Sequence, residues 1–172
     1  MNPNKSTTEP PAPEQEKVSA GQIDHCLVET HKHVRSVQAK IMVFVKELLD
    51  RAMSHDKTKF EEPELSIFAA HTDKLAKITY GSEEYKESLE ATKQAIEHHH
   101  AKNRHHPEFH KNGINDMTLV DLVELLSDWK ASTERVRNGN IRKSLETNVK
   151  RYNIDSQLAQ ILDNTVREYF ED

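Results

Sequence analysis

Apolar residues recur at helical spacing through most of the chain. From Gln22 to about Ala52 they follow one another at intervals of three or four residues, with one gap of seven, which is the pattern of a long amphipathic helix. A second helix is predicted from Pro63, which suits a first helical turn, to about Lys77. A turn at Tyr80–Gly81 and an N-cap at Ser82 introduce a third helix from Glu83 to about Ala101.

The second half of the chain continues this pattern after a polar loop. The loop covers residues 102–117, and Thr118 caps a fourth helix that reaches about Arg137. The run Asn138-Gly139-Asn140 predicts a left-handed cap at the end of that helix, and two more amphipathic helices follow. The chain is therefore predicted to be all-α, a bundle of about six helices.

Two segments interrupt the helical pattern. Residues 1 to about 20 hold four of the six prolines among polar side chains, and they bury too little to offset the entropy of ordering, so a disordered tail is predicted. Ser54, Asp56 and Thr58 compete with helical hydrogen bonds, so the first helix should end or bend near them. The remaining residues, 21–172, suit one domain with a single core.

Composition narrows the class of protein. Apolar residues make up 35% and charged residues 31% of the chain, the balance of a soluble protein. No apolar stretch is long enough for a bilayer and no signal peptide is recognisable, so a cytoplasmic protein without a membrane partner is expected. The single Cys26 fits a reducing compartment. A net charge of −5 without a basic block argues against nonspecific nucleic-acid binding and leaves a small phosphorylated substrate or ligand as the expected partner.

Six of the eleven histidines fall between His98 and His110. Neutral imidazole is the commonest protein ligand of transition metals, so this run suggests a metal site. The alternative is a solvated polar loop. His98–His100 occupy the last turn of the third predicted helix, where successive side chains point about 100° apart, so only one or two of them can face a common centre.

Other polar residues are candidates for the same site. His33 lies on the shoulder of the apolar stripe of the first helix, and the His55-Asp56 doublet follows that helix. On the fourth helix, Asp121, Glu124 and Asp128 share one face. That face is either an acidic solvent face or, because the helix is apolar over most of its circumference, the lining of a site.

The order of these residues resembles that of the HD-domain superfamily of metal-dependent phosphohydrolases. These all-helical enzymes hold a divalent metal with a lone histidine, an HD doublet and a distant aspartate, matched here by His33, the His55-Asp56 doublet and Asp128. The run HDKTKF is similar to the superfamily's HD-x-G-K, with Lys59 matching its lysine and a threonine where glycine is common. The run from His98 to Asn103 resembles the H-H-x-x-x-D of the HD-GYP branch.

From about residue 20 onward, the chain also resembles a family of small proteins of unknown function found in bacteria and phages. Its distinctive phrases are N-x-H-H-P-E, present from Asn103 to Glu108, and D-W-K-A, present from Asp128 to Ala131. The first phrase stands where HD-GYP proteins have a glycine-rich turn. This resemblance implies that the matching residues form one site, but it supplies no reaction.

The resemblances imply a role for each candidate. The residues expected to hold one divalent ion are His33, His55, Asp56 and Asp128, and those expected to hold a second ion or the phosphate are His98 and His99. A mixed imidazole and carboxylate set favours Mn, Fe, Co, Ni or Zn over Ca. The residues expected to assist catalysis, by offsetting phosphate charge or by orienting an imidazole or water, are Lys59, His105, His106, Glu108 and Glu124. Lys59 also fits an ordinary surface lysine.

Together these features predict a metal-dependent phosphohydrolase acting on a nucleotide or another small phosphoester. One alternative is a regulatory or interaction protein that binds a metal or nucleotide without hydrolysis. Another is a helical structural protein with a histidine-rich loop.

Overall fold

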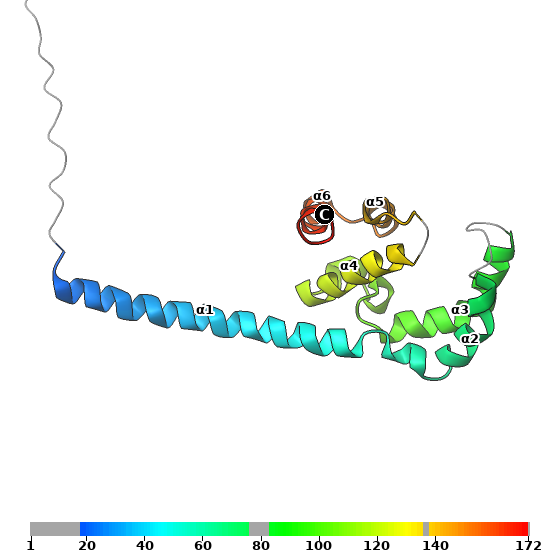
Figure 1. The fold of residues 1–172 in the computed structure, drawn as a ribbon, viewed down its shortest axis with the longest axis horizontal. Coiled ribbons are helices and arrows are strands. Elements are labelled where there is room, and N and C mark those ends of the chain that lie inside the picture. Colours follow the sequence, from blue (N-terminus) through cyan, green and yellow to red (C-terminus); the bar gives the residue numbers. More distant parts are fainter. Residues whose placement is uncertain (1–17, 76–82, 136–137, 172) are drawn as a thin grey trace, which may run out of the picture. The chain divides into compact units, whose positions relative to one another are not determined.

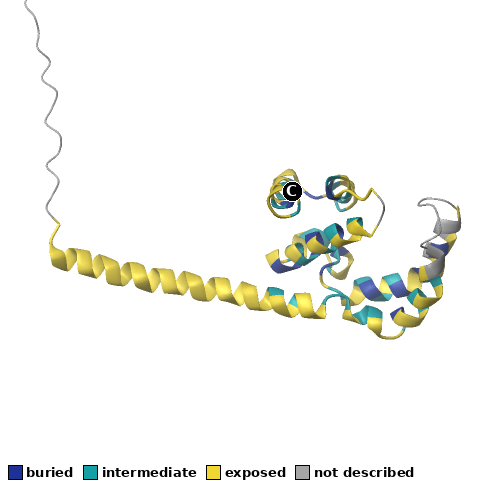
Figure 2. Ribbon diagram, in the orientation of Figure 1, coloured by how far each residue is buried: buried dark blue, intermediate teal, exposed yellow. Residues whose placement is uncertain are grey.

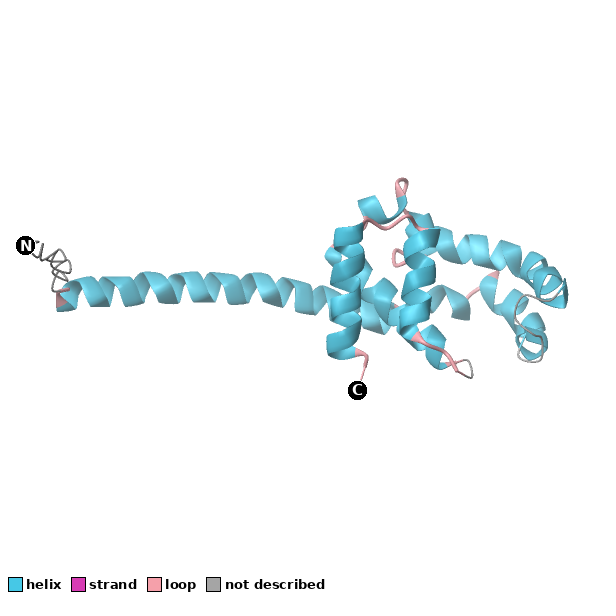
Figure 3. Cartoon of the chain, turned by 90° about the horizontal axis from the view of Figure 1, so that it is seen from above, coloured by secondary structure: helices cyan, strands magenta, loops and turns pink. Residues whose placement is uncertain are grey.

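The computed structural model describes residues 18–75, 83–135 and 138–171, which form helices and loops with no strand among them (Figures 1 and 3). The predicted all-α class is confirmed. The α-helices of the described residues are α1 (Ala20–Ser54), α2 (Glu64–Leu75), α3 (Glu83–Lys102), α4 (Leu119–Glu134), α5 (Ile141–Arg151) and α6 (Ser156–Tyr169). The predicted tail over residues 1–17, the turn at Tyr80–Gly81 and the cap at Ser82 lie outside the described residues.

The chain divides into two compact units, residues 1–43 and 44–172, and a single domain starting at residue 21 stays a prediction. The described part of the first unit is one stretch of α1. The predicted long helix is confirmed, but no residue of it is buried (Figure 2). None of the described helices is long and apolar enough to span a membrane.

Local capping explains where α4, α5 and α6 begin. The Thr118 hydroxyl accepts from the Asp121 amide while the Asp121 carboxylate accepts from the Thr118 amide, a reciprocal capping box. The side chains of Asn140 and Asp155 accept from backbone amides in the first turns of α5 and α6. Asn138 has a left-handed backbone with a φ of 65°. It does not cap α4, because that helix ends at Glu134 with Arg135 as a right-handed C-cap, so the predicted left-handed cap of this helix is wrong.

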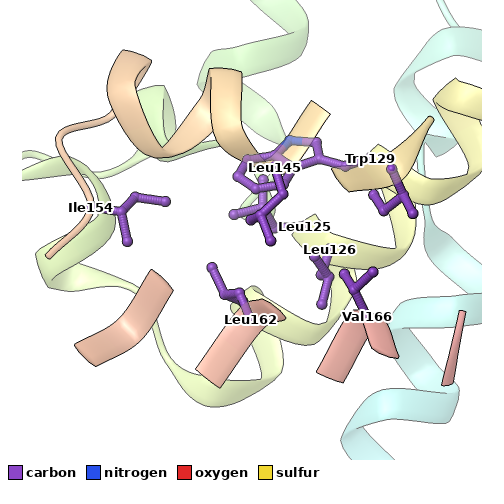
Figure 4. Close-up of a cluster of buried hydrophobic side chains, with 8 residues drawn as sticks. Leu125, Leu126, Trp129, Leu145, Ile154, Leu162 and Val166 are labelled. Carbon is purple, nitrogen blue, oxygen red and sulfur yellow. The ribbon is translucent and has the colours of Figure 1, made fainter. Parts of the chain in front are cut away.

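Helices α4, α5 and α6 share one apolar core in the second unit (Figure 4). Leu125 and Val166 are fully buried in it, and burying each such side chain contributes about 1.5–3 kcal/mol. Trp129 belongs to this core and stacks on Tyr152 with 6.1 Å between the ring centroids. Because packing in this core fixes the orientation of α4 about its axis, it also fixes where the face with Asp121, Glu124 and Asp128 points.

The rest of the second unit pairs α2 with α3, and the 3-10 turns η1 (Lys57–Phe60) and η2 (Pro107–Phe109) pack on α3. Helix α1 ends at Ser54, as predicted, and Asp56 has a left-handed backbone with a φ of 54°. Few non-glycine residues hold that conformation, although Asp tolerates it. The chain therefore turns sharply after α1, which brings Asp56 within 3.1 Å of His99 at the end of α3.

Candidate metal centre

Four residues from three segments converge in the second unit. Asp56 follows α1, His99 lies in the last turn of α3, and His105 and His106 lie in the loop after α3. One nitrogen or oxygen atom of each lies within 4.8 Å of those of the other three, so this group could hold a metal ion. We call these four residues the metal cluster.

The atoms of the metal cluster that point to its centre lack other partners. Asp56 Oδ1, His99 Nε2, His105 Nε2 and His106 Nε2 are buried, and none of them makes a hydrogen bond with a described residue. His99 Nε2 and Asp56 Oδ1 are 3.1 Å apart but are not aligned as a hydrogen bond. A buried polar atom without a partner costs about 1–3 kcal/mol. Four such atoms at one point therefore fit the donor set of a bound cation.

A buried carboxylate on α2 orients two histidines. Glu64 is fully buried, and its two oxygens accept from His98 Nδ1 at 2.7 Å and from His99 Nδ1 at 2.9 Å. The Thr58 hydroxyl also donates to Glu64, at 3.0 Å. A carboxylate on one ring nitrogen fixes the tautomer and leaves the other nitrogen for a metal. In His99 that other nitrogen is the unpaired Nε2.

Glu124 on α4 orients two further histidines. Its Oε1 lies 2.9 Å from His55 Nδ1 and 3.1 Å from His105 Nδ1, and Arg51 donates to its other oxygen at 2.8 Å. Burial alone would raise the pKa of Glu124, but hydrogen bonds from His105 and His55 lower it to about 2. The carboxylate is therefore ionised at neutral pH, and His105 keeps its Nε2 free for the metal cluster.

Asp121 supports this arrangement from the start of α4. It is fully buried, and it accepts from Arg51 at 2.8 Å and from Arg104 at 3.1 Å and 3.2 Å. Burial alone would raise the pKa of Asp121, but hydrogen bonds from Arg104, Thr118 and Arg51 hold it well below its usual range. Asp121 thus connects α4 to the end of α1 through Arg51 and, through Arg104, to residues 103–110 after α3, which we call the histidine loop. The interpretation of the acidic face as a solvent face is wrong here.

Asp56 uses its two oxygens differently. Oδ2 accepts from Lys59 Nζ at 2.5 Å, while Oδ1 is the unpaired oxygen of the metal cluster. Burial alone would raise the pKa of Asp56, but His99 and Lys59 beside it hold it well below its usual range. Lys59 is therefore the ion-pair partner of a cluster residue, and its role in offsetting phosphate charge stays a prediction.

His106 is held in the neutral form that binds metals. Burial lowers its pKa to about 2, and the neighbouring histidines act in the same direction. His100, His106 and Glu108 make another, more exposed group of possible ligand atoms. Glu108 accepts from Arg151 Nη2 at 3.0 Å and from the Tyr152 hydroxyl at 3.1 Å, so it connects the histidine loop to the end of α5.

Acidic side chains outnumber Arg and Lys side chains around the metal cluster. The acidic groups are Asp56, Glu64, Asp121, Glu124 and Asp128, and the Arg and Lys residues paired with them are Arg51, Lys59 and Arg104. The pKa of the neighbouring His55 is raised, chiefly by its hydrogen bond to Glu124. The carboxylates therefore favour positive charge nearby, on an imidazole or on a bound cation.

The structure brings most of the predicted site residues together, in groups that differ from the predicted ones. His55 and Asp128 form, with His105, a further group of possible ligand atoms, in which His55 Nε2 lies 3.8 Å from Asp128 Oδ1. His105 and His106, predicted to assist catalysis, lie in the metal cluster itself. His98 is in none of the three described groups, and its role as a ligand stays a prediction.

Sequence reasoning missed the residues that hold the site in place. In the sequence, Glu64, Arg51 and Arg104 look like ordinary surface charges. Glu64, for example, stands in an acidic run at the start of α2. Only its complete burial distinguishes it. His33 is exposed in the first unit, and its predicted role as a ligand is untested.

Fold and site together define an all-helical protein with a group of three histidines and an aspartate, buried at His99 and His105, that could hold a metal ion. The chain belongs to a family of unknown function, DUF5662, whose model matches residues 22–169. No curated protein and no solved structure matches it.

Proposed function

We propose that this protein is a metal-dependent phosphohydrolase acting on a nucleotide or another small phosphoester. The observation that carries the proposal is the convergence of four buried, unpaired atoms from Asp56, His99, His105 and His106. The order of His33, the His55-Asp56 doublet and Asp128 along the chain, which resembles that of HD-domain enzymes, supports the choice of reaction.

The donor set fits a divalent transition metal. Three imidazoles and one carboxylate suit Mn, Fe, Co, Ni or Zn, whereas Ca prefers oxygen ligands alone. The metal cluster would hold this ion, and His55 with Asp128 would be available to a second one. Such an ion, when bound, polarises a phosphoryl group and makes water a nucleophile at neutral pH.

The chain's own residues have distinct tasks in this proposal. Glu64 and Glu124 orient the imidazoles through their Nδ1 atoms, and so they position rather than react. Lys59, already paired with Asp56, would offset phosphate charge. Glu108 holds the histidine loop against α5 through Arg151.

An activity screen tests the proposal. The purified chain loaded with Mn is assayed against nucleotides and generic phosphoesters, next to His99→Ala and Asp56→Ala. The expected result is turnover that falls at least 100-fold in both variants. His31→Ala, an exposed histidine of α1, is the matched control and should retain full turnover. Equal turnover in all four proteins would refute the proposal.

A second candidate is a metal-binding protein without turnover. Four protein ligands are enough to fill a tetrahedral shell, as in structural zinc sites, whereas catalytic sites keep a position open. This candidate predicts stoichiometric Zn binding with no hydrolysis of any phosphoester in the screen, and a loss of binding in His99→Ala.

A further inference from the structure

Helix α1 carries an apolar seam with a regular spacing. The seam positions alternate by four and three residues without a break, and they are Ile23, Leu27, Thr30, Val34, Val37, Ile41, Phe44 and Leu48. Six of the seven apolar members are between 42% and 54% exposed. The helix thus carries a continuous apolar stripe, and no residue of α1 is buried.

The spacing points to a particular kind of partner. A repeat of four and three residues averages 3.5, whereas a straight helix has 3.6 residues per turn and drifts about 20° per seven residues from such a stripe. A strict 3.5 repeat is instead matched by a second helix that supercoils around the first. Thr30 is the one polar member of the seam.

The length of the seam indicates which helix can pair with it. The seam from Ile23 to Leu48 spans about 38 Å at 1.5 Å per residue. The longest other described helix, α3, has 20 residues and spans about 30 Å. Among the described helices, therefore, only another α1 matches the seam along its whole length.

We propose that α1 pairs with α1 of a second copy of this chain through the seam. In each copy the pairing would remove seven apolar seam side chains from water, six of which are 42–54% exposed, and removing apolar area from water favours association. The pairing also explains how so long a helix persists, because helices in water depend mainly on a packed apolar face. The proposal does not rest on the proposed function.

Sedimentation equilibrium of the full chain tests the pairing. The expected mass is twice the 19.9 kDa of one chain. Val34→Glu places a charge in the seam and should reduce the mass to that of one chain. Ala39→Glu adds the same charge on the opposite side of α1 and should leave the mass at two chains.

A second measurement covers the case in which the seam variant loses structure. The thermal midpoint of the unchanged protein should rise with its concentration, because association stabilises the folded state by mass action. A single-chain mass at all concentrations, a mass other than two chains, or an unchanged mass in Val34→Glu would overturn the proposal.

Discussion

Two regions of the second unit are held together by opposite means. The core of α4, α5 and α6 contains Leu125 and Val166, both fully buried among apolar neighbours. The metal cluster has the same degree of burial at His99 and His105, yet its atoms are polar, and four of them have no described partner. The apolar core needs no further partner, whereas the metal cluster has four polar atoms available to a bound cation.

The two regions differ in whether the interactions that stabilise them depend on orientation. Apolar packing is non-directional and depends on the area removed from water, so the core forms wherever the helices bury their stripes. The metal cluster depends on aimed groups, namely the Nδ1 bonds of His99 and His105 to Glu64 and Glu124. We therefore expect core stability to be independent of metal, and the stability of the cluster region to depend on it.

The largest expected effect comes from breaking the core. Leu125→Ala leaves a cavity at a fully buried position and should lower the free energy of unfolding by about 2–5 kcal/mol. Urea denaturation with Mn and with EDTA should give the same loss. Ile161→Ala, at a residue that is 54% exposed, is the control and should change stability by less than about 0.5 kcal/mol. A loss that differs between the two conditions would mean that core and cluster are not separable.

Removing the metal should destabilise the region around the metal cluster and leave the stability of the apolar core unchanged. A ligand present at 100 times its Kd stabilises the folded state by about 2.7 kcal/mol, so chelation should lower the thermal midpoint by several degrees. Calorimetry before and after EDTA, and after reloading with Mn or Zn, measures this shift. In Asp56→Ala the midpoint should not respond to chelation. A wild-type midpoint that ignores EDTA would contradict the assignment.

Replacing the Glu64 carboxylate, which orients His99, should have a smaller effect, seen in the metal affinity. Glu64→Gln keeps the shape but removes the charge that orients His99, and it should weaken metal affinity about 10–100-fold. Titration calorimetry with Zn measures the change. Glu62→Gln, an exposed residue of the same acidic run, should bind like the wild type. Equal affinities for the two variants would show that Glu64 has no part in orienting the ligands.

A separate effect is expected in the pH dependence of the chelated protein. The pKa of Glu124 is lowered from 4.5 to about 2, so this carboxylate stabilises the fold above pH 4.5, and that contribution is lost as the pH falls toward 2. In Glu124→Gln, the free energy of unfolding measured in urea should therefore fall less steeply over this window. Identical slopes in variant and wild type would contradict the low pKa.

The helices could be predicted from sequence because burial needs only a repeat of apolar positions. The cap at Thr118 was equally local, since it depends on a contact with Asp121, three residues away. The metal cluster was only partly predictable. Asp56 and His99 belong to runs that are distinctive as text, whereas Glu64 acquires its role through a contact 35 residues away.

Metal stoichiometry tests the central claim most directly. The untagged chain is stripped with a chelator, reloaded with Mn or Zn, freed of excess ion and examined by elemental analysis. We predict at least one ion per chain in the wild type and in His31→Ala, and a loss of at least one ion per chain in His99→Ala. A reloaded wild-type protein that retains no stoichiometric metal, or a His99→Ala variant that retains as much as the wild type, would contradict the account.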